Sequence, residues 1–163
     1  MKKIIELKFE EFDGPAHLSA PDAELLSIAR MATGNAYAPY SGFSVAAAAR
    51  LSNGEIVTGT NQENASYPAG ICAERVLLSA VASQFSGSKI SAIAVSYNNR
   101  NGGSDQPVSP CGICRQSLVE YERRNGDAIR LILSGQSGPV LVIESAADLL
   151  PLAFTNEELK RVR

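Results

Sequence analysis

The chain has 163 residues, 45% of them hydrophobic, and its 15 Lys and Arg against 17 Asp and Glu give a net charge of -2. This size predicts one core, with an N-terminal arm or edge strand at 1–18 and a single folded domain at 19–163. The balanced charge argues against a nucleic-acid partner, which would require clustered Lys and Arg. The apolar runs are too short for a membrane span.

Apolar and charged residues alternate over 1–18, which predicts the edge strand or appended arm. Residues 21–36 carry apolar side chains at helical spacing. They predict an amphipathic helix that is capped by Ser19 or Ala20 and ends at Gly34-Asn35.

The segment 44–51 holds four consecutive alanines, which favour a helix by propensity. Asn53-Gly54 follows as a hairpin signal, and residues 55–59 continue as an extended segment. We therefore predict a strand at 44–51, whose small side chains suit close cover by helices.

The remaining elements follow from apolar periodicity and turn residues. We predict helices at 70–85 and 110–124, strands at 90–97, 128–134 and 140–143, a mobile loop at 98–106, a short turn at 148–154, and a last helix capped by Asn156. Strands that alternate with helices predict an α/β sandwich.

All three cysteines belong to two short motifs at predicted helix starts, Cys72-Ala73-Glu74 and Pro110-Cys111-Gly112-Ile113-Cys114. Helix starts favour thiolates, because their unpaired N–H groups and dipole attract anions. Cys111 and Cys114 are three residues apart and share one helix face. A CxxC alone indicates a redox or structural site, but a third cysteine at a second helix start predicts a zinc site with one open position.

A closed structural site would need a fourth protein ligand, and His17 in the arm is the only histidine. We interpret His17 as an ordinary arm residue, so the open position favours catalysis. The odd cysteine number, with two in the CxxC, argues against disulfides and favours a reducing, cytoplasmic setting.

Two charged residues follow Cys72 directly. Glu74 is spaced to lie over the open face of the metal as a proton carrier, although a first-turn carboxylate also suits the helix dipole. Three thiolates leave a zinc site with excess negative charge. Arg75 is therefore a candidate for hydrogen bonds to the sulfurs, its alternative being a helix-surface residue.

Four stretches occur in order along the chain: 38–45 (APYSGFSV), 61–68 (NQENASYP), 70–75 (GICAER) and 109–116 (SPCGICRQ). Together they closely resemble the small homotetrameric cytidine deaminases of pyrimidine salvage, over about residues 21–154. The resemblance implies a three-layer α/β/α sandwich with a mixed five-stranded sheet and one Zn²⁺ per subunit. It also implies hydrolytic deamination of cytidine and 2'-deoxycytidine, with release of ammonia.

The resemblance also implies roles for single residues. Cys72, Cys111 and Cys114 would bind zinc, and Glu74 would be the catalytic proton shuttle. The substrate contacts would be Phe43 on the pyrimidine, Asn61 and Glu63 on the ribose, the backbone of Ala65 and Cys72 at the base edge, and Phe154 from a neighbouring subunit.

Some of these residues have plainer interpretations. Asn61 and Glu63 alternate along an extended segment and can face one pocket, but they could equally end a strand. Phe43 and Phe154 would by default be core residues. Leu152 is larger than the residue the family usually has there.

Three other functions compete with this one. A related deaminase of small aminopyrimidines, such as one acting on blasticidin S, need not keep Asn61 and Glu63. A polynucleotide deaminase would need a cationic channel and stacking side chains, whereas this chain is near neutral and has no Trp. A non-enzymatic zinc module would need the missing fourth ligand.

Overall fold

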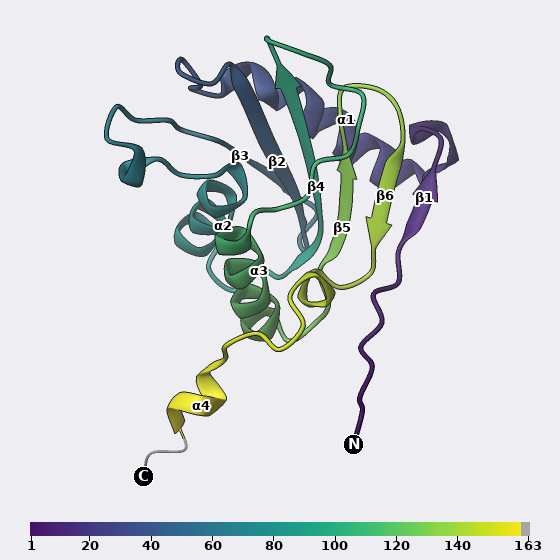
Figure 1. The fold of residues 1–163 in the computed structure, drawn as a ribbon, viewed down its shortest axis with the longest axis vertical. Helices are drawn as coiled ribbons and strands as arrows, with labels where there is room; N and C mark the ends of the chain where they lie inside the picture. Colours follow the sequence, from purple (N-terminus) through teal and green to yellow (C-terminus); the bar gives the residue numbers. More distant parts are fainter. Residues whose placement is uncertain (161–163) are drawn as a thin grey trace.

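A mixed sheet of six strands forms the middle layer of the protein in this computed structural model, which describes residues 1–160 (Figure 1). Only β4 and β5 pair in parallel; the other neighbours are antiparallel. The strand order is β1-β6-β5-β4-β2-β3, with β1 at Glu10–Phe12, β2 at Phe43–Leu51, β3 at Ile56–Thr60, β4 at Ile90–Asn99, β5 at Arg130–Ser134 and β6 at Val140–Ile143.

The predicted number of five strands is wrong, because the arm contributes a sixth. Residues Glu10–Phe12 form β1, which pairs with β6 and sets Glu10 opposite Val142. Such a short segment carries little periodicity of its own, and its partner lies far along the chain. The arm is thus an edge strand over three residues and a projecting segment over residues 1–9.

Helices cover both faces of this sheet and complete the three layers. The helix α1 lies on one face, behind the sheet in Figure 1, whereas α2 and α3 lie on the other. The α-helices are α1 at Ala20–Ala32, α2 at Ala73–Gln84, α3 at Gly112–Asn125 and α4 at Asn156–Lys160, and the 3-10 turns are η1 at Pro15–His17, η2 at Thr33–Asn35, η3 at Tyr67–Ala69 and η4 at Ala146–Leu149.

Most element predictions are confirmed, with shifts at the ends. Ser19 caps α1, its hydroxyl accepting from the N–H of Asp22 at 3.3 Å, and η2 ends the helix as predicted. The predicted loop at 98–106 begins two residues later, because β4 continues to Asn99. The carbonyl of Ser104 in this loop accepts from the backbone N–H of Gln136 at 2.6 Å, which ties the loop to the β5–β6 connection.

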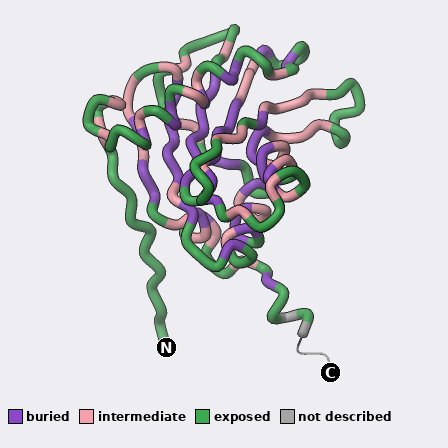
Figure 2. Tube along the Cα trace, turned by 180° about the vertical axis from the view of Figure 1, so that it is seen from behind, coloured by how far each residue is buried: buried purple, intermediate pink, exposed green. Residues whose placement is uncertain are grey.

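Buried alanines let both helical layers approach the sheet closely. Ala46–Ala49 of β2 are fully buried, although their propensity favours a helix. Ala47 and Ala49 join the core beneath α2 and α3, and Ala48 joins the core beneath α1. In Figure 2 the buried segments run through the interior of the fold, and exposed segments surround them. The hairpin turn at Asn53-Gly54 pairs this segment with β3, so that it forms a strand, as predicted.

A glycine in β3 sets the position of α2. A Cβ atom added at Gly59 would lie 2.4 Å from the backbone nitrogen of Leu77 and 2.6 Å from the carbonyl oxygen of Ala73. No side chain other than hydrogen fits there, so β3 and the backbone of α2 are in direct contact. This contact fixes the start of α2, where Cys72 and Glu74 lie.

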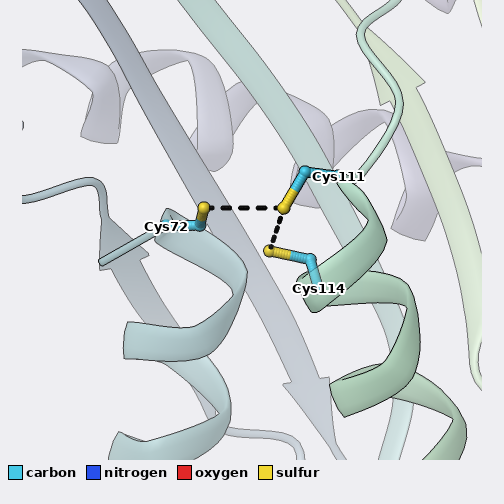
Figure 3. A group of neighbouring side chains, drawn as sticks. All are labelled: Cys72, Cys111 and Cys114. Carbon is cyan, nitrogen blue, oxygen red and sulfur yellow. Dashed lines mark hydrogen bonds between the residues drawn. The ribbon is translucent and has the colours of Figure 1, made fainter. Parts of the chain in front are cut away.

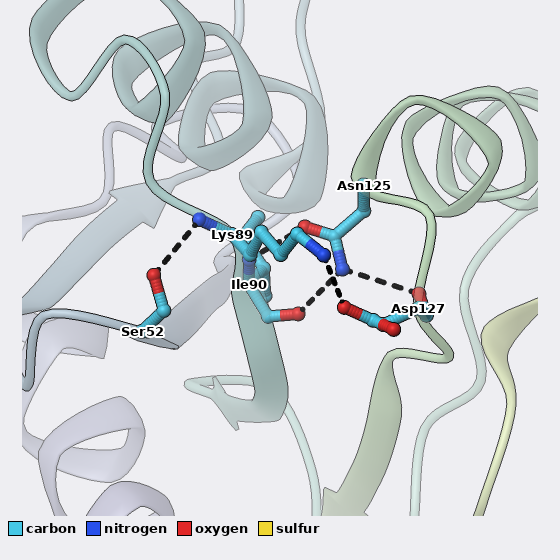
Figure 4. A network of polar contacts seen from close by, with 5 residues as sticks. All are labelled: Ser52, Lys89, Ile90, Asn125 and Asp127. Atoms are coloured by element: carbon cyan, nitrogen blue, oxygen red, sulfur yellow. Dashed lines mark hydrogen bonds and ion pairs between the residues drawn. The ribbon is translucent and has the colours of Figure 1, made fainter.

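A polar network holds the C-terminal end of α3 (Figure 4). The amide of Asn125 accepts from the N–H of Ile90 at 2.8 Å and donates to the carbonyls of Ile90 at 3.0 Å and Asp127 at 3.1 Å. The ammonium of Lys89 pairs with Asp127 at 2.5 Å, and its backbone N–H donates to Ser52. These bonds tie α3 to the start of β4. Among the described residues no helix is long and apolar enough to cross a membrane.

Candidate metal centre and active site

The three cysteines meet between the starts of α2 and α3 (Figure 3). Cys72 and Cys111 are the N-cap residues of their helices, and Cys114 lies in the first turn of α3. The Sγ atoms of Cys72 and Cys111 are 3.8 Å apart, and those of Cys111 and Cys114 are 3.4 Å apart. Cys72 is thus one position earlier than the predicted first turn, which leaves its sulfur at the positive end of the helix.

This spacing fits a zinc ion. A tetrahedral Zn²⁺ with Zn–S bonds of about 2.3 Å holds its sulfurs roughly 3.8 Å apart. Two helix N-termini also direct their dipoles at the cluster and favour thiolates. His17 is exposed on η1 and lies outside the cluster of potential ligands found among the described residues. The closed Cys₃His alternative therefore lacks its fourth ligand.

The protonation of the cysteines also calls for a cation. A hydrogen bond with Cys114 lowers the pKa of Cys72 to about 6, although its burial acts the other way. The same hydrogen bond, burial and the charge of Glu74 raise the pKa of Cys114. A thiolate at Cys72 therefore opposes a second one at Cys114, and a bound cation would keep both deprotonated together.

Glu74 lies beside the cluster in the first turn of α2 and is only 5% exposed. Its Oε2 accepts from the thiol of Cys114 at 3.4 Å. It lines a cavity of about 200 Å³ together with two of the cysteines and the apolar side chains of Val45 and Val95. A carboxylate in this position can exchange protons with a molecule in the cavity.

A second hollow of about 430 Å³ adjoins the first, and Asn61 and Cys72 line both. Polar and aromatic groups surround it, including Tyr40, Glu63 and Tyr67. The two together form a site with a narrow apolar floor at the sulfurs and a wider polar mouth. Of the predicted substrate contacts, Asn61 and Glu63 belong to this site.

Both of these side chains are held by the backbone of neighbouring segments. The amide of Asn61 accepts from the N–H of Val45 at 2.7 Å and donates to the carbonyl of Phe43 at 3.0 Å. The carboxylate of Glu63 accepts from the hydroxyl of Ser41 at 2.5 Å and from the N–H of Tyr40 at 2.9 Å. These bonds also lower the pKa of Glu63. Both polar groups are thus oriented before any ligand binds.

Phe43 begins β2 beside this site and stacks on Tyr97 of β4, with ring centroids 4.7 Å apart and an interplanar angle of 15°. Alternation along β2 and β4 places both rings on the sheet face that carries Val45 and Val95. Ala65 is exposed, between Asn64, which lines the wider hollow, and Ser66.

Phe154 and Arg75 lie together, away from the sulfur cavity. Both line a separate hollow of about 480 Å³ on the outer side of α2 and α3. Phe154 is 61% exposed, and its carbonyl accepts from the amide of Gln116 at 2.9 Å. Among the described residues the guanidinium of Arg75 makes no hydrogen bond to a sulfur, but its charge contributes to the lowered pKa of Cys72.

Two residues that hold predicted contacts in place were not predicted from the sequence. Ser41 holds Glu63 and stands in the 38–45 stretch, but nothing in the sequence pairs it with position 63. Tyr97 stacks on Phe43. Because Tyr97 and Val95 are two residues apart on a strand, the sequence predicts that they share a sheet face. Only the register of β2 against β4 shows that Phe43 lies beside Tyr97.

Known proteins resemble this chain over most of its length. Residues 19–125 match the family described as the cytidine and deoxycytidylate deaminase zinc-binding region. The cytidine deaminase of Mycobacterium tuberculosis is 36% identical over 135 residues, which cover 83% of this chain and 90% of that protein. The cytidine deaminase of Halalkalibacterium halodurans is also 36% identical over 135 residues, covering 83% of this chain and 95% of that protein.

Solved structures agree. The crystal structure of cytidine deaminase from Burkholderia pseudomallei superposes with a TM-score of 0.70 at 38% identity, covering 84% of this chain and all of that one. The family match, residues 19–125, includes the segments that carry the cysteine cluster. With the three sulfurs at zinc spacing beside a buried Glu74, the chain belongs to the zinc-binding cytidine and deoxycytidylate deaminase family.

Proposed function

We propose that this protein is a zinc-dependent hydrolase of pyrimidine salvage that converts cytidine and 2'-deoxycytidine to uridine and 2'-deoxyuridine and releases ammonia. One observation carries the proposal. The three-sulfur cluster and the buried Glu74 line a narrow cavity that opens into a polar hollow with preset Asn61 and Glu63. A flat base fits the narrow part, and a sugar fits the wide part.

A bound zinc ion supplies Lewis acidity and lowers the pKa of a water molecule, so that a nucleophile is available near neutral pH. Cys72, Cys111 and Cys114 would hold it, and the two helix dipoles offset part of their negative charge. Glu74 would accept one proton from the attacking water and pass it to N3, and would then take the second proton from the hydroxyl on C4 and pass it to the amino group, which leaves as ammonia. Its burial beside Cys114 keeps it at the reacting atoms.

The sugar and base contacts complete the proposal. Asn61 and Glu63 receive the ribose hydroxyls, and their existing hydrogen bonds reduce the entropy lost when the ligand binds. Phe43, backed by Tyr97, offers an aromatic face to the pyrimidine. The backbone at Ala65 and Cys72 reads the base edge.

Assembly and setting belong to the same proposal. Residues 19–163 act as one catalytic domain in a homotetramer, and Phe154 closes the pocket of a neighbouring subunit. Phe154 lines a hollow of its own chain but stays 61% exposed, and this exposure supports the arrangement. Arg75 lies in that hollow and offsets thiolate charge. Three free cysteines beside one another suit a reducing, cytoplasmic compartment.

The test is the loss of absorbance when zinc-loaded protein meets cytidine, 2'-deoxycytidine, cytosine, CMP or blasticidin S. We expect turnover of the two nucleosides and little of the other three compounds. Equal activity on cytosine would contradict the roles of Asn61 and Glu63. Activity on blasticidin S alone would replace the proposed substrate. X-ray absorption that finds four protein ligands on the zinc would instead support a non-enzymatic module.

A further inference from the structure

The N-terminal arm, residues 1–9, lies outside everything so far assigned to this protein. It projects from β1 as an extended segment and is exposed along its whole length (Figures 1 and 2). The family match begins only at residue 19. The structure from Burkholderia pseudomallei is covered completely while 84% of this chain is used. The arm lies outside the family match, and the deaminase reaction does not explain its role.

The arm carries a row of apolar side chains that its own chain leaves uncovered. Ile5, Leu7 and Phe9 are 59%, 45% and 53% exposed. In an extended segment these alternate residues share one side, while Glu6, Lys8 and Glu10 share the other. Ordering such a segment is entropically unfavourable unless contacts compensate. Apolar residues grouped in this way indicate a binding surface.

The arm also continues a strand whose outer edge is available. β1 pairs with β6 on one side and is the last strand of the sheet on the other. An edge of this kind presents backbone donors and acceptors that can pair with an added strand. Any partner of the arm should therefore be an extended segment with a complementary pattern of apolar and charged residues.

We propose that the partner is the same arm of a second copy, paired antiparallel about a two-fold axis at Leu7. In this register the numbers of any two residues that lie opposite each other add up to fourteen. Leu7 then faces Leu7 of the second copy, and Ile5 faces Phe9. Glu6 faces Lys8 and Lys3 faces Glu11, each pair occurring twice by symmetry. Residues 2–4 of each copy lie along the open edge of the other copy's β1 and add a strand to its sheet.

The charge pattern selects this register over its neighbours. Apolar rows meet only when the residue sum is even, because side chains alternate between the two sides. A shift to a sum of twelve sets Glu6 against itself, and a shift to sixteen sets Lys8 against itself. Like charges directly opposite each other are destabilising, as they would be at every charged position of a parallel pair.

The arm is separate from the active site, because none of its residues lines the sulfur cavity or the adjoining polar hollow. The arm leaves the sheet at β1, which the order β1-β6-β5-β4-β2-β3 puts at the opposite edge from β3. The inference therefore does not depend on the deaminase activity. Assembly through the arm could fail while catalysis remains, and the reverse also holds.

Disulfide trapping tests the register directly. Residues opposite each other in an antiparallel pair have Cα atoms about 4.5–5.5 Å apart, within the roughly 4.4–6.8 Å that a disulfide spans. Zinc-loaded full-length Leu7→Cys, oxidised in air, should form a covalent dimer on a non-reducing gel. Two Ile5→Cys copies should not, because their Cα atoms would be about 13 Å apart. Ile5→Cys mixed with Phe9→Cys should form the heterodimer.

A charge exchange supplies the matched control. In the Leu7→Cys background, Lys8→Glu puts Glu against Glu twice, so cross-linking at low salt should slow several-fold. Adding Glu6→Lys restores both pairs with swapped partners and should restore the rate. High salt should reduce the difference between the variants, because exposed charges are screened.

Wild-type protein and zinc content serve as controls, because the native cysteines must stay protected in the metal site. Equal cross-linking of Leu7→Cys and Ile5→Cys would overturn the register and show non-specific collision. No Leu7→Cys dimer at concentrations where the protein is oligomeric would show that the arm binds elsewhere. A double charge variant that behaves like Lys8→Glu would remove the pairing of Glu6 with Lys8.

Discussion

At the residue scale, Glu74 contacts Cys114 and lines the same cavity as Cys72 and Cys111. Glu74→Gln keeps the shape of the side chain and an acceptor for the Cys114 thiol, but it cannot carry protons. General acid–base catalysis contributes about 10²–10⁴-fold, and the proposed mechanism uses Glu74 in several steps. We expect kcat to fall by at least the upper end of this range, whereas zinc stays bound.

Steady-state kinetics and metal analysis check this prediction, with Glu55→Gln in the exposed β2–β3 hairpin as the control. Loss of zinc from Glu74→Gln would show that Glu74 stabilises the site rather than the reaction. Near-normal kcat would remove it from the mechanism altogether.

Single residues also show how far sequence reasoning reaches. The sulfur cluster follows from spacing, because residues three apart on a helix share a face. The contacts of Asn61 do not follow from spacing. Its amide forms hydrogen bonds with the backbone of Phe43 and Val45, which lie on β2. The sequence shows that Asn61 is polar, but the register of β2 decides what it holds.

At the element scale, α2 depends on Gly59 of β3. Gly59→Ala would place a methyl group 2.4 Å from the nitrogen of Leu77, against backbone that cannot rotate away. Overpacking of this kind typically destabilises by about 1–3 kcal/mol. The displaced helix would also carry Cys72 away from Cys111. We therefore expect a lower urea midpoint and weaker zinc binding in the same variant.

Gly34→Ala is the matched control, since a Cβ atom at Gly34 meets no atom within 4 Å. Urea titration and competition with a zinc chelator measure the two effects. If Gly59→Ala lost stability but kept wild-type zinc affinity, the position of α2 would not control the metal site.

At the scale of the whole molecule, the C-terminal segment leaves two large apolar side chains exposed, Leu152 and Phe154. Leu152 is 92% exposed and has a φ of 59°, a left-handed conformation that favours glycine. This explains why a smaller residue is expected there. Phe154 follows it, exposed, on the far side of α2 and α3 from the sulfur cavity. In its own chain it does not line the cavity that holds Glu74 and the cysteines.

Subunit mixing tests whether Phe154 acts on a neighbour. Phe154→Ala should weaken substrate binding and leave zinc in place, because an aromatic contact adds about 0.5–1.5 kcal/mol beyond its buried area. Glu74→Gln and Phe154→Ala chains, dissociated and reassembled together, would form some sites with one intact Glu74 and one intact Phe154. We expect activity per mole above the average of the two separate variants.

Native mass spectrometry must show that the subunits have exchanged. Exchange without any gain in activity would confine Phe154 to a role within its own chain. A gain that also occurs when Glu74→Gln is mixed with an unrelated protein would reflect dilution or crowding instead.

The sequence by itself determined the zinc chemistry, the α/β class and most element positions. These depend on local spacing, namely cysteines at helix starts, alternation in strands and turn residues such as Asn53-Gly54. Only the tertiary structure decided that β1 joins β6, that Tyr97 backs Phe43 and that Ser41 holds Glu63. Each of these contacts joins segments far apart in the chain, and their partners are selected by sheet register and close packing, which no local pattern encodes.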